Sequence, residues 1–181
     1  MNLKLLRRNR LFEGRVFNVI VDDVEYPSGN RSVREVAEHI GGAVVLAVFP
    51  DESVILIRQH RYPLGQFIVE LPAGKLNVGE DPLHCAQREL DEETGYSAKT
   101  WTKLSAIYTT PGFCNEVLHI YMARDLQESP GGRKLEEGEL TMTMETVPIG
   151  EAIEMIARQE IRDGKTICGL LLGERLLHKD G

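Results

Sequence analysis

The sequence predicts an α/β fold in which helices cover both faces of a mixed β-sheet. Two apolar stretches of strand length, residues 43–49 and 54–57, follow each other closely and predict buried strands. A helix with clear start and stop signals follows them, and two further helical stretches end the chain. At 181 residues, 42% of them hydrophobic and 27% charged, the chain suits one globular domain with a small extension.

Residues 1–40 are expected to form a separate, strand-rich segment. The main domain is expected to cover residues 41–181. Residues 15–25 are rich in β-branched side chains and end at the turn residues 27–30, so that residues 31–38 complete a hairpin. The basic run at residues 7–10 is interpreted as a solvated arm. Because a small strand-rich segment cannot bury its apolar side alone, we expect it to need a partner surface.

The main domain is expected to contain strands on both sides of its first helix, and two helices at its C-terminal end. The two apolar strands are joined by a turn at residues 50–53, and a further strand at residues 67–71 stops at Pro72. Later strands are expected at residues 103–109, 117–122 and 140–147, with a flexible glycine-rich loop at residues 129–134. Helices are expected at residues 149–159 and 168–177.

The first helix of the main domain is bounded by residues with known positional preferences. Asp81 can cap it, Pro82 suits its first position, and Gly95 suits the position just past its end. One side of this helix is expected to face the core. That side consists of Leu83, Ala86, Leu90 and Thr94.

Charge and cysteine content exclude several classes of protein. The formal charge of −7 and the pI near 5.3 argue against general nucleic-acid binding. Cys85, Cys114 and Cys168 are odd in number and lack CxxC spacing, which argues against a disulfide framework or a zinc site. Without a signal peptide or a membrane-spanning apolar run, a cytoplasmic protein with no membrane or nucleic-acid partner is expected.

Clustered glutamates on the first helix predict a cation site. Glu89 and Glu93 are four residues apart and so lie about 40° apart around the helix axis, where they can share a cation. Glu92 lies farther round the helix and can bind a second ion. Arg88 precedes Glu92 by four residues and can pair with it. Carboxylates gathered in this way repel one another unless a cation compensates them.

Other residues of the same segment support this interpretation. Gly74 permits a tight turn that can bring a main-chain carbonyl, that of Ala73, to the metal. Magnesium prefers oxygen ligands and can lower the pKa of an attacking water. A solvated glutamate-rich helix face is the alternative interpretation. That alternative must also explain Gly74, Glu80 and Gly95 at their offsets.

Residues 74–96 match every defining position of the Nudix box, so the chain resembles Nudix hydrolases. The resemblance implies the Nudix fold, an α/β/α sandwich with a mixed sheet, and hydrolysis of a nucleoside diphosphate linked to another group. It also implies that Glu89, Glu92 and Glu93 bind metal, with Mg²⁺ as the ion and Mn²⁺ as an alternative. Glu80 corresponds to a supporting position of the motif.

Flanking motifs resemble the ADP-ribose pyrophosphatase subfamily. These are residues 58–63, 70–74 and 110–113, together with Pro111, which follows Tyr96 by fifteen residues, as a proline does in that subfamily. The resemblance implies cleavage of ADP-ribose to AMP and ribose 5-phosphate. Residues 160–166 also resemble GDP-mannose-cleaving relatives, so GDP-mannose or a broader range of nucleoside diphosphate sugars is the alternative. A non-catalytic ADP-ribose sensor is a more remote one.

Substrate contacts are expected outside the box. Arg58 and Arg61 end a predicted strand and can bind phosphate, with a surface charge as the alternative for Arg58. Glu116 can accept hydrogen bonds from ribose hydroxyls, or can simply face water.

The catalytic base is expected on a mobile loop late in the chain, as in the subfamily. Its candidates, besides metal-bound Glu93, are Glu136, Glu137 and Glu139, approached through Gly131 and Gly132. A solvated acidic loop is the alternative. The resemblance also implies a homodimer in which residues 1–40 form a dimerisation segment.

Overall fold

The computed structural model describes residues 2–179 and divides into two compact units. The smaller unit consists of residues 1–41 and 108–117, and the larger unit consists of residues 42–107 and 118–181. Among the described residues, no helix is long and apolar enough to cross a membrane.

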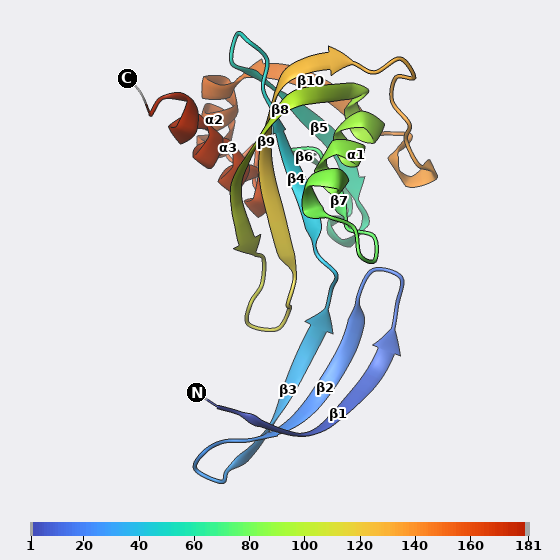
Figure 1. Ribbon diagram of the computed structural model, residues 1–181, viewed down its shortest axis with the longest axis vertical. Coiled ribbons are helices and arrows are strands. Elements are labelled where there is room, and N and C mark those ends of the chain that lie inside the picture. Colours follow the sequence, from blue (N-terminus) through green and yellow to red (C-terminus); the bar gives the residue numbers. More distant parts are fainter. Residues whose placement is uncertain (1, 180–181) are drawn as a thin grey trace. The chain divides into compact units, whose positions relative to one another are not determined.

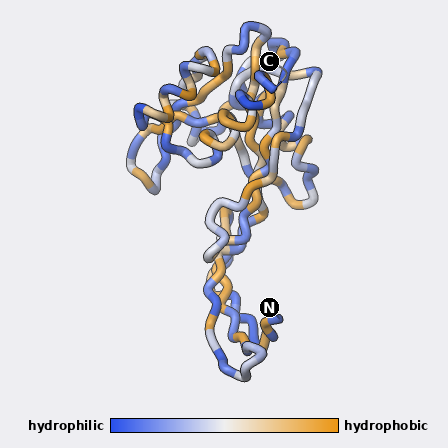
Figure 2. The backbone as a smooth tube through the Cα atoms, turned by 90° about the vertical axis from the view of Figure 1, so that its left-hand side faces the viewer, coloured by the Kyte–Doolittle hydropathy of each residue, from blue (hydrophilic) through white to orange (hydrophobic). Residues whose placement is uncertain are grey.

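The smaller unit is built on a three-stranded antiparallel sheet in the order β1-β2-β3 (Figure 1). Its strands are β1 (Lys4–Glu13), β2 (Asn18–Glu25) and β3 (Arg31–Glu38). Hydrophobic and hydrophilic stretches alternate along this unit in Figure 2. Residues 7–10 are not the solvated arm that we expected. They belong to β1, where Arg8 forms two hydrogen bonds of 2.8 and 2.7 Å with Asp22 of β2.

The larger unit holds two sheets. One has the order β10-β5-β6 and the other β7-β4-β9-β8. The central pair β4–β9 is parallel, whereas β4–β7, β5–β6 and β5–β10 are antiparallel, so the architecture is mixed as predicted. The strands are β4 (Gly42–Ala47), β5 (Ser53–Arg61), β6 (Gln66–Glu70), β7 (Ala73–Lys75), β8 (Tyr96–Tyr108), β9 (Val117–Glu128) and β10 (Thr143–Pro148).

Within the described residues, three α-helices flank these sheets, and Figure 1 shows α1 on one side and α2 and α3 on the other. They are α1 (Pro82–Thr94), α2 (Ile149–Ala157) and α3 (Gly164–Leu177), with short 3₁₀ turns η1 (Tyr62–Leu64) and η2 (Glu137–Glu139). Each side has its own buried apolar cluster: Leu90 of α1 packs with Val45 and Ile55, and Leu170 of α3 packs with Leu46. The predicted α/β sandwich is confirmed.

Several boundaries differ from those expected from sequence. β8 begins at Tyr96, directly after α1, rather than at residue 103. α3 begins at Gly164 rather than at residue 168, because the Asp163 side chain caps it by accepting a hydrogen bond from the Thr166 amide. The start of the strand expected at residues 140–147 is displaced by η2, and β7 was not predicted.

Candidate active site

Helix α1 has the boundaries that its sequence predicts. Asp81 accepts hydrogen bonds from the amides of Leu83 and His84, at 2.8 and 3.4 Å, and Gly95 ends the helix with a left-handed φ of 74°. The predicted apolar side faces the core: Leu83 is partly buried, and Ala86, Leu90 and Thr94 are buried. The same helix also buries two carboxylates, those of Glu89 and Glu93.

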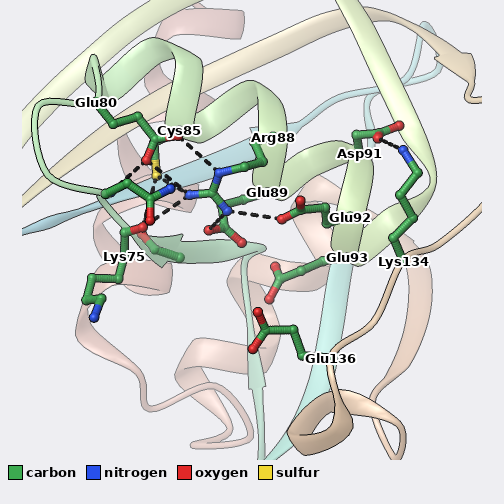
Figure 3. Close-up of polar contacts among 12 residues, drawn as sticks. Lys75, Glu80, Cys85, Arg88, Glu89, Asp91, Glu92, Glu93, Lys134 and Glu136 are labelled. Atoms are coloured by element: carbon green, nitrogen blue, oxygen red, sulfur yellow. Dashed lines mark hydrogen bonds and ion pairs between the residues drawn. The ribbon is translucent and has the colours of Figure 1, made fainter. Parts of the chain in front are cut away.

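Arg88 is the hub of the polar contacts on α1. Its guanidinium binds Glu80 at 3.0 and 3.2 Å, and one nitrogen reaches both Glu89, at 2.6 Å, and Glu92, at 3.0 Å (Figure 3). The predicted pair with Glu92 is therefore present. The hydrogen bond from Arg88 is also the main reason why the pKa of Glu80 lies below its usual value. Glu80 thus helps to hold the Arg88 guanidinium in place, and Arg88 in turn contacts the carboxylates of Glu89 and Glu92.

Gly74 is required for a different reason from the one expected. It lies in β7, paired with Ala43 of β4, and does not form a tight turn. A Cβ atom at Gly74 would lie 1.8 Å from the Glu89 Oε1 atom. Glycine is therefore needed because the Glu89 carboxylate packs directly against the main chain of β7.

Glu93 is the most deeply buried carboxylate of the site, with 2% of its surface exposed. It accepts a hydrogen bond of 2.9 Å from the Ala73 amide. Burial, and then the negative charge of Glu89, raise the pKa of Glu93 well above its usual value. Burial also raises the pKa of Glu89, against the opposing effect of Arg88. Added positive charge would stabilise both ionised carboxylates.

The residues present fit a hard divalent cation. Every candidate donor is an oxygen atom, either a carboxylate of α1 or the main-chain carbonyl of Ala73, and oxygen ligands suit magnesium and manganese. Within residues 2–179, no group of three or more His, Cys, Asp or Glu side chains already surrounds a common point. Arg88 instead bonds to both Glu89 and Glu92.

The acidic loop, residues 136–139, faces these carboxylates. Its turn η2 is closed by reciprocal hydrogen bonds between Glu136 and Glu139. The charge of Glu139 contributes to the raised pKa of both Glu89 and Glu93, so the three groups interact. Figure 3 shows Glu136 pointing toward Glu93. The preceding segment at residues 129–134 was predicted to be flexible, but it is hydrogen-bonded to the end of α1.

Sequence reasoning missed a buried charge network beside Arg61. The guanidinium binds Glu70 at 2.8 and 3.1 Å, and Glu70 has only 1% of its surface exposed. Lys165 also binds Glu70, and pairs with Asp163 at 2.9 Å. A charged residue at the end of an apolar strand, as Glu70 is, was the signal that could have revealed this network.

The structure does not bring Arg58 and Arg61 together. Arg58 lies over the Phe67 ring, 4.8 Å from its centroid, whereas Arg61 pairs with Glu70. Both are on β5, and residues three apart on a strand point to opposite faces. The assignment of each arginine to a phosphate stays a prediction. Glu116 belongs to the smaller unit, where its carboxylate lies 3.1 Å from the His39 Nδ1 atom.

Comparison with known proteins agrees with this arrangement. Residues 38–169 match the model of the NUDIX domain. The chain belongs to the Nudix hydrolase family. Members of this family generally need a divalent metal ion, in keeping with the oxygen donors of α1.

Three relatives of this Nudix hydrolase span most of its length. It is 43% identical to ADP-ribose pyrophosphatase of Bacillus subtilis over 163 residues, 90% of this chain and 88% of the relative. It is 40% identical to the methanol dehydrogenase activator of Bacillus methanolicus, covering 97% and 96%. It is 35% identical to GDP-mannose pyrophosphatase of Shigella flexneri, covering 76% and 75%.

A solved structure supports the fold independently. The crystal structure of an ADP compounds hydrolase superposes with a TM-score of 0.84, covering 100% of this chain and 97% of that one. At 23% identity, this likeness concerns the fold alone.

Proposed function

We propose that this Nudix hydrolase cleaves the diphosphate bond of ADP-ribose to give AMP and ribose 5-phosphate, with Mg²⁺ as its metal ion. The observation that carries the proposal is the 43% identity to an ADP-ribose pyrophosphatase over nearly the whole of both chains. The arrangement of buried carboxylates on α1 supports it, because a dianionic diphosphate cannot approach them without a compensating cation.

Four groups would hold the cation: the carboxylates of Glu89, Glu92 and Glu93 and the carbonyl of Ala73. Mn²⁺ would also suit these oxygen donors. When bound, such an ion neutralises diphosphate charge and lowers the pKa of a bound water. The protein contributes by holding the carboxylates in place: Arg88 orients Glu89 and Glu92, and the Ala73 amide orients Glu93.

A glutamate of the acidic loop would accept the proton of the attacking water. Glu136, Glu137 and Glu139 are the candidates, and Figure 3 shows the first of them pointing toward Glu93. Arg61, held by Glu70, would bind a phosphate oxygen. Arg58 and Glu116 stay candidates for contacts with the substrate, with a phosphate and with ribose hydroxyls respectively.

We also propose that residues 1–40 mediate a cytoplasmic homodimer and that residues 41–181 form the catalytic domain. The support is the exposed apolar surface of the smaller unit: Leu5, Leu11 and Phe12 of β1 are 50%, 68% and 54% exposed. Such surface favours a protein partner, whereas nothing in the net charge of −7 favours nucleic acid. Sedimentation equilibrium at micromolar concentration should give the mass of a dimer.

A second candidate substrate is GDP-mannose. It is favoured by the 35% identity to GDP-mannose pyrophosphatase and by residues 160–166, which hold the Lys165 that binds Glu70. A sensor that binds ADP-ribose without cleaving it is the remaining alternative, and the complete set of box glutamates argues against it.

A substrate panel separates these proposals. ADP-ribose, GDP-mannose, ADP-glucose and diadenosine compounds are each incubated with the protein and Mg²⁺. Nucleotide release is measured by chromatography, and the resulting kcat/KM values are compared between substrates. We expect the highest kcat/KM with ADP-ribose, with AMP and ribose 5-phosphate as products. Preference for GDP-mannose would replace the proposed substrate, and binding of ADP-ribose without turnover would support the sensor.

A further inference from the structure

Residues 129–134 wrap around the C-terminal end of α1. The Ser129 amide donates to the Gly95 carbonyl at 2.7 Å, and the Lys134 amide donates to the Glu92 carbonyl at 2.8 Å. The Lys134 ammonium also pairs with the Asp91 carboxylate at 2.5 Å (Figure 3). Because the last carbonyls of a helix lack donors within the helix, these contacts complete its end. They also fix the start of the chain that leads to the acidic loop.

Arg133 connects this helix end to the far side of the acidic loop. Its Nε–H group donates to the Glu93 carbonyl at 2.6 Å, and its Nη1 atom donates to the Met142 carbonyl at 3.2 Å. Met142 is 3% exposed, and its amide donates to the Glu139 carbonyl at 2.7 Å. One guanidinium thus bridges the helix that carries the carboxylates and the residue that closes the acidic loop.

Arginine is particularly suited to this position. Its planar fork presents several donors in fixed directions, whereas a lysine ammonium acts from a single point. Replacement by lysine would therefore retain the charge but lose the simultaneous contact with the two carbonyls. The positive charge at the C-terminal end of α1 also interacts favourably with the helix dipole.

The bridge acts against electrostatic repulsion. The charge of Glu139 interacts unfavourably with both Glu89 and Glu93, so the acidic loop is repelled by the carboxylates that it faces. Two cations, Arg133 and Lys134, lie where the loop leaves the helix.

We infer that Arg133 is a positioning residue for the reaction: it holds the acidic loop against the carboxylates of α1, so that a loop glutamate can take the proton of the attacking water. This inference rests on the proposed hydrolysis and goes beyond it, since Arg133 acts through the loop without touching the substrate. A displacement of about 1 Å in such a group can lower turnover about a hundredfold.

The first test compares Arg133→Met and Arg133→Lys with a matched control, Arg158→Met. Arg158 also pairs near a helix end, with Glu151 and Glu160 of the larger unit, but on α2 and the segment after it. With ADP-ribose and Mg²⁺, we expect Arg133→Met to lower kcat about thirtyfold with KM changed less than about threefold, and Arg133→Lys to lower kcat less. The control should stay within about twofold of wild type.

The second test asks whether Arg133 acts through the loop. Arg133→Met is introduced into a variant in which Glu136, Glu137 and Glu139 are all replaced by glutamine. If the residues act as one unit, the added loss of kcat should fall from about thirtyfold to less than about threefold. A full additional thirtyfold loss in this background would overturn the inference, since it would show that Arg133 acts independently of the loop.

Hydrogen exchange provides a readout that does not depend on the substrate. We expect amides 136–142 to exchange faster in Arg133→Met than in wild type and in Arg158→Met. Unchanged exchange there, together with wild-type kcat, would overturn the inference. If the wild-type protein does not hydrolyse ADP-ribose, the proposed function fails, while the exchange experiment still decides whether Arg133 holds the loop.

Discussion

Helix α1 and the sheet of the smaller unit use charge in opposite ways. On α1, Glu89 and Glu93 are buried and face Arg88 and the acidic loop within the same unit. In the sheet, the ion pairs of Arg8 and Arg10 lie near the surface, and nearly every residue of β1 is exposed. The larger unit therefore buries part of its charge network, whereas β1 of the smaller unit exposes apolar side chains. This contrast is the basis for proposing catalysis in the larger unit and assembly through the smaller one.

The largest effect is expected at Glu93, the most deeply buried carboxylate of α1. Glu93→Gln should lower kcat by about a thousandfold or more, because it removes a charged group that would hold the metal ion and polarise the water. The fold should be retained, since a neutral amide carries a smaller desolvation penalty than a carboxylate and its oxygen can still accept the hydrogen bond from the Ala73 amide. Glu154→Gln, a change to an exposed carboxylate on α2, is the control and should keep wild-type turnover. Near-normal activity of Glu93→Gln would refute the assignment of Glu93.

A smaller effect is expected from the close approach of Glu89 to the main chain. In Gly74→Ala, the new Cβ would meet the Glu89 carboxylate at 1.8 Å, so this flexible side chain must move. We expect Mn²⁺ affinity, measured by calorimetry, to fall about tenfold to a hundredfold, as for other changes that misorient a ligand. Gly150→Ala on α2, where a Cβ would meet nothing within 4 Å, should leave affinity unchanged. Equal affinities in the two variants would contradict this explanation of Gly74.

The oligomeric state tests the role proposed for the smaller unit. Leu11→Glu places a charge on a residue of β1 that is 68% exposed, and should raise the dimer dissociation constant about tenfold or more, measured by sedimentation. Leu171→Glu, at a residue of α3 that is 48% exposed, should have no effect on assembly. A wild-type protein that is monomeric at micromolar concentration would refute the proposed dimer.

The smallest expected effect is on the stability of the fold at acidic pH. The hydrogen bond from Arg8 lowers the pKa of Asp22, so its contribution to stability is present above the usual pKa of 3.8 and is lost as pH falls through the lower folded pKa. Glu93 behaves oppositely: its folded pKa lies above 4.5, so the metal-free folded state gains stability as pH falls toward 4.5.

Denaturant unfolding with a chelator present, between pH 3 and 7, measures both effects. Asp22→Asn should weaken the loss of stability in acid, and Glu93→Gln should remove the gain between neutral pH and 4.5. A Glu93→Gln variant whose stability follows wild type across this range would show that folding does not raise the pKa of Glu93, against the effect expected from its burial.

The sequence predicted the α1 side of the molecule well, because local rules determine it. Capping by Asp81, the left-handed Gly95 and the pairing of Arg88 with Glu92 follow from neighbours within a few residues. The contacts that were missed join distant segments. Gly74 is constrained by Glu89 from another element, and Glu70 is paired with Lys165, 95 residues away. Residue spacing along the chain does not predict such contacts.

The same limitation applies to β1 and to the loop before η2. The basic run at residues 7–10 lacks apolar alternation, and its strand is established by pairing with β2 and by the bond between Arg8 and Asp22. Glycines at 131 and 132 suggested freedom, yet the next two residues bind the end of α1. Composition indicates where a chain can bend, but tertiary hydrogen bonds decide whether it moves.

Anomalous X-ray scattering from Mn²⁺ in crystals grown with a non-hydrolysable ADP-ribose analogue tests the central proposal most directly. We predict a strong anomalous peak in contact with carboxylate oxygens of Glu89, Glu92 or Glu93, with the diphosphate of the analogue among its remaining ligands. A well-ordered analogue with no metal peak beside α1, and with these carboxylates turned toward bulk solvent, would contradict the proposal.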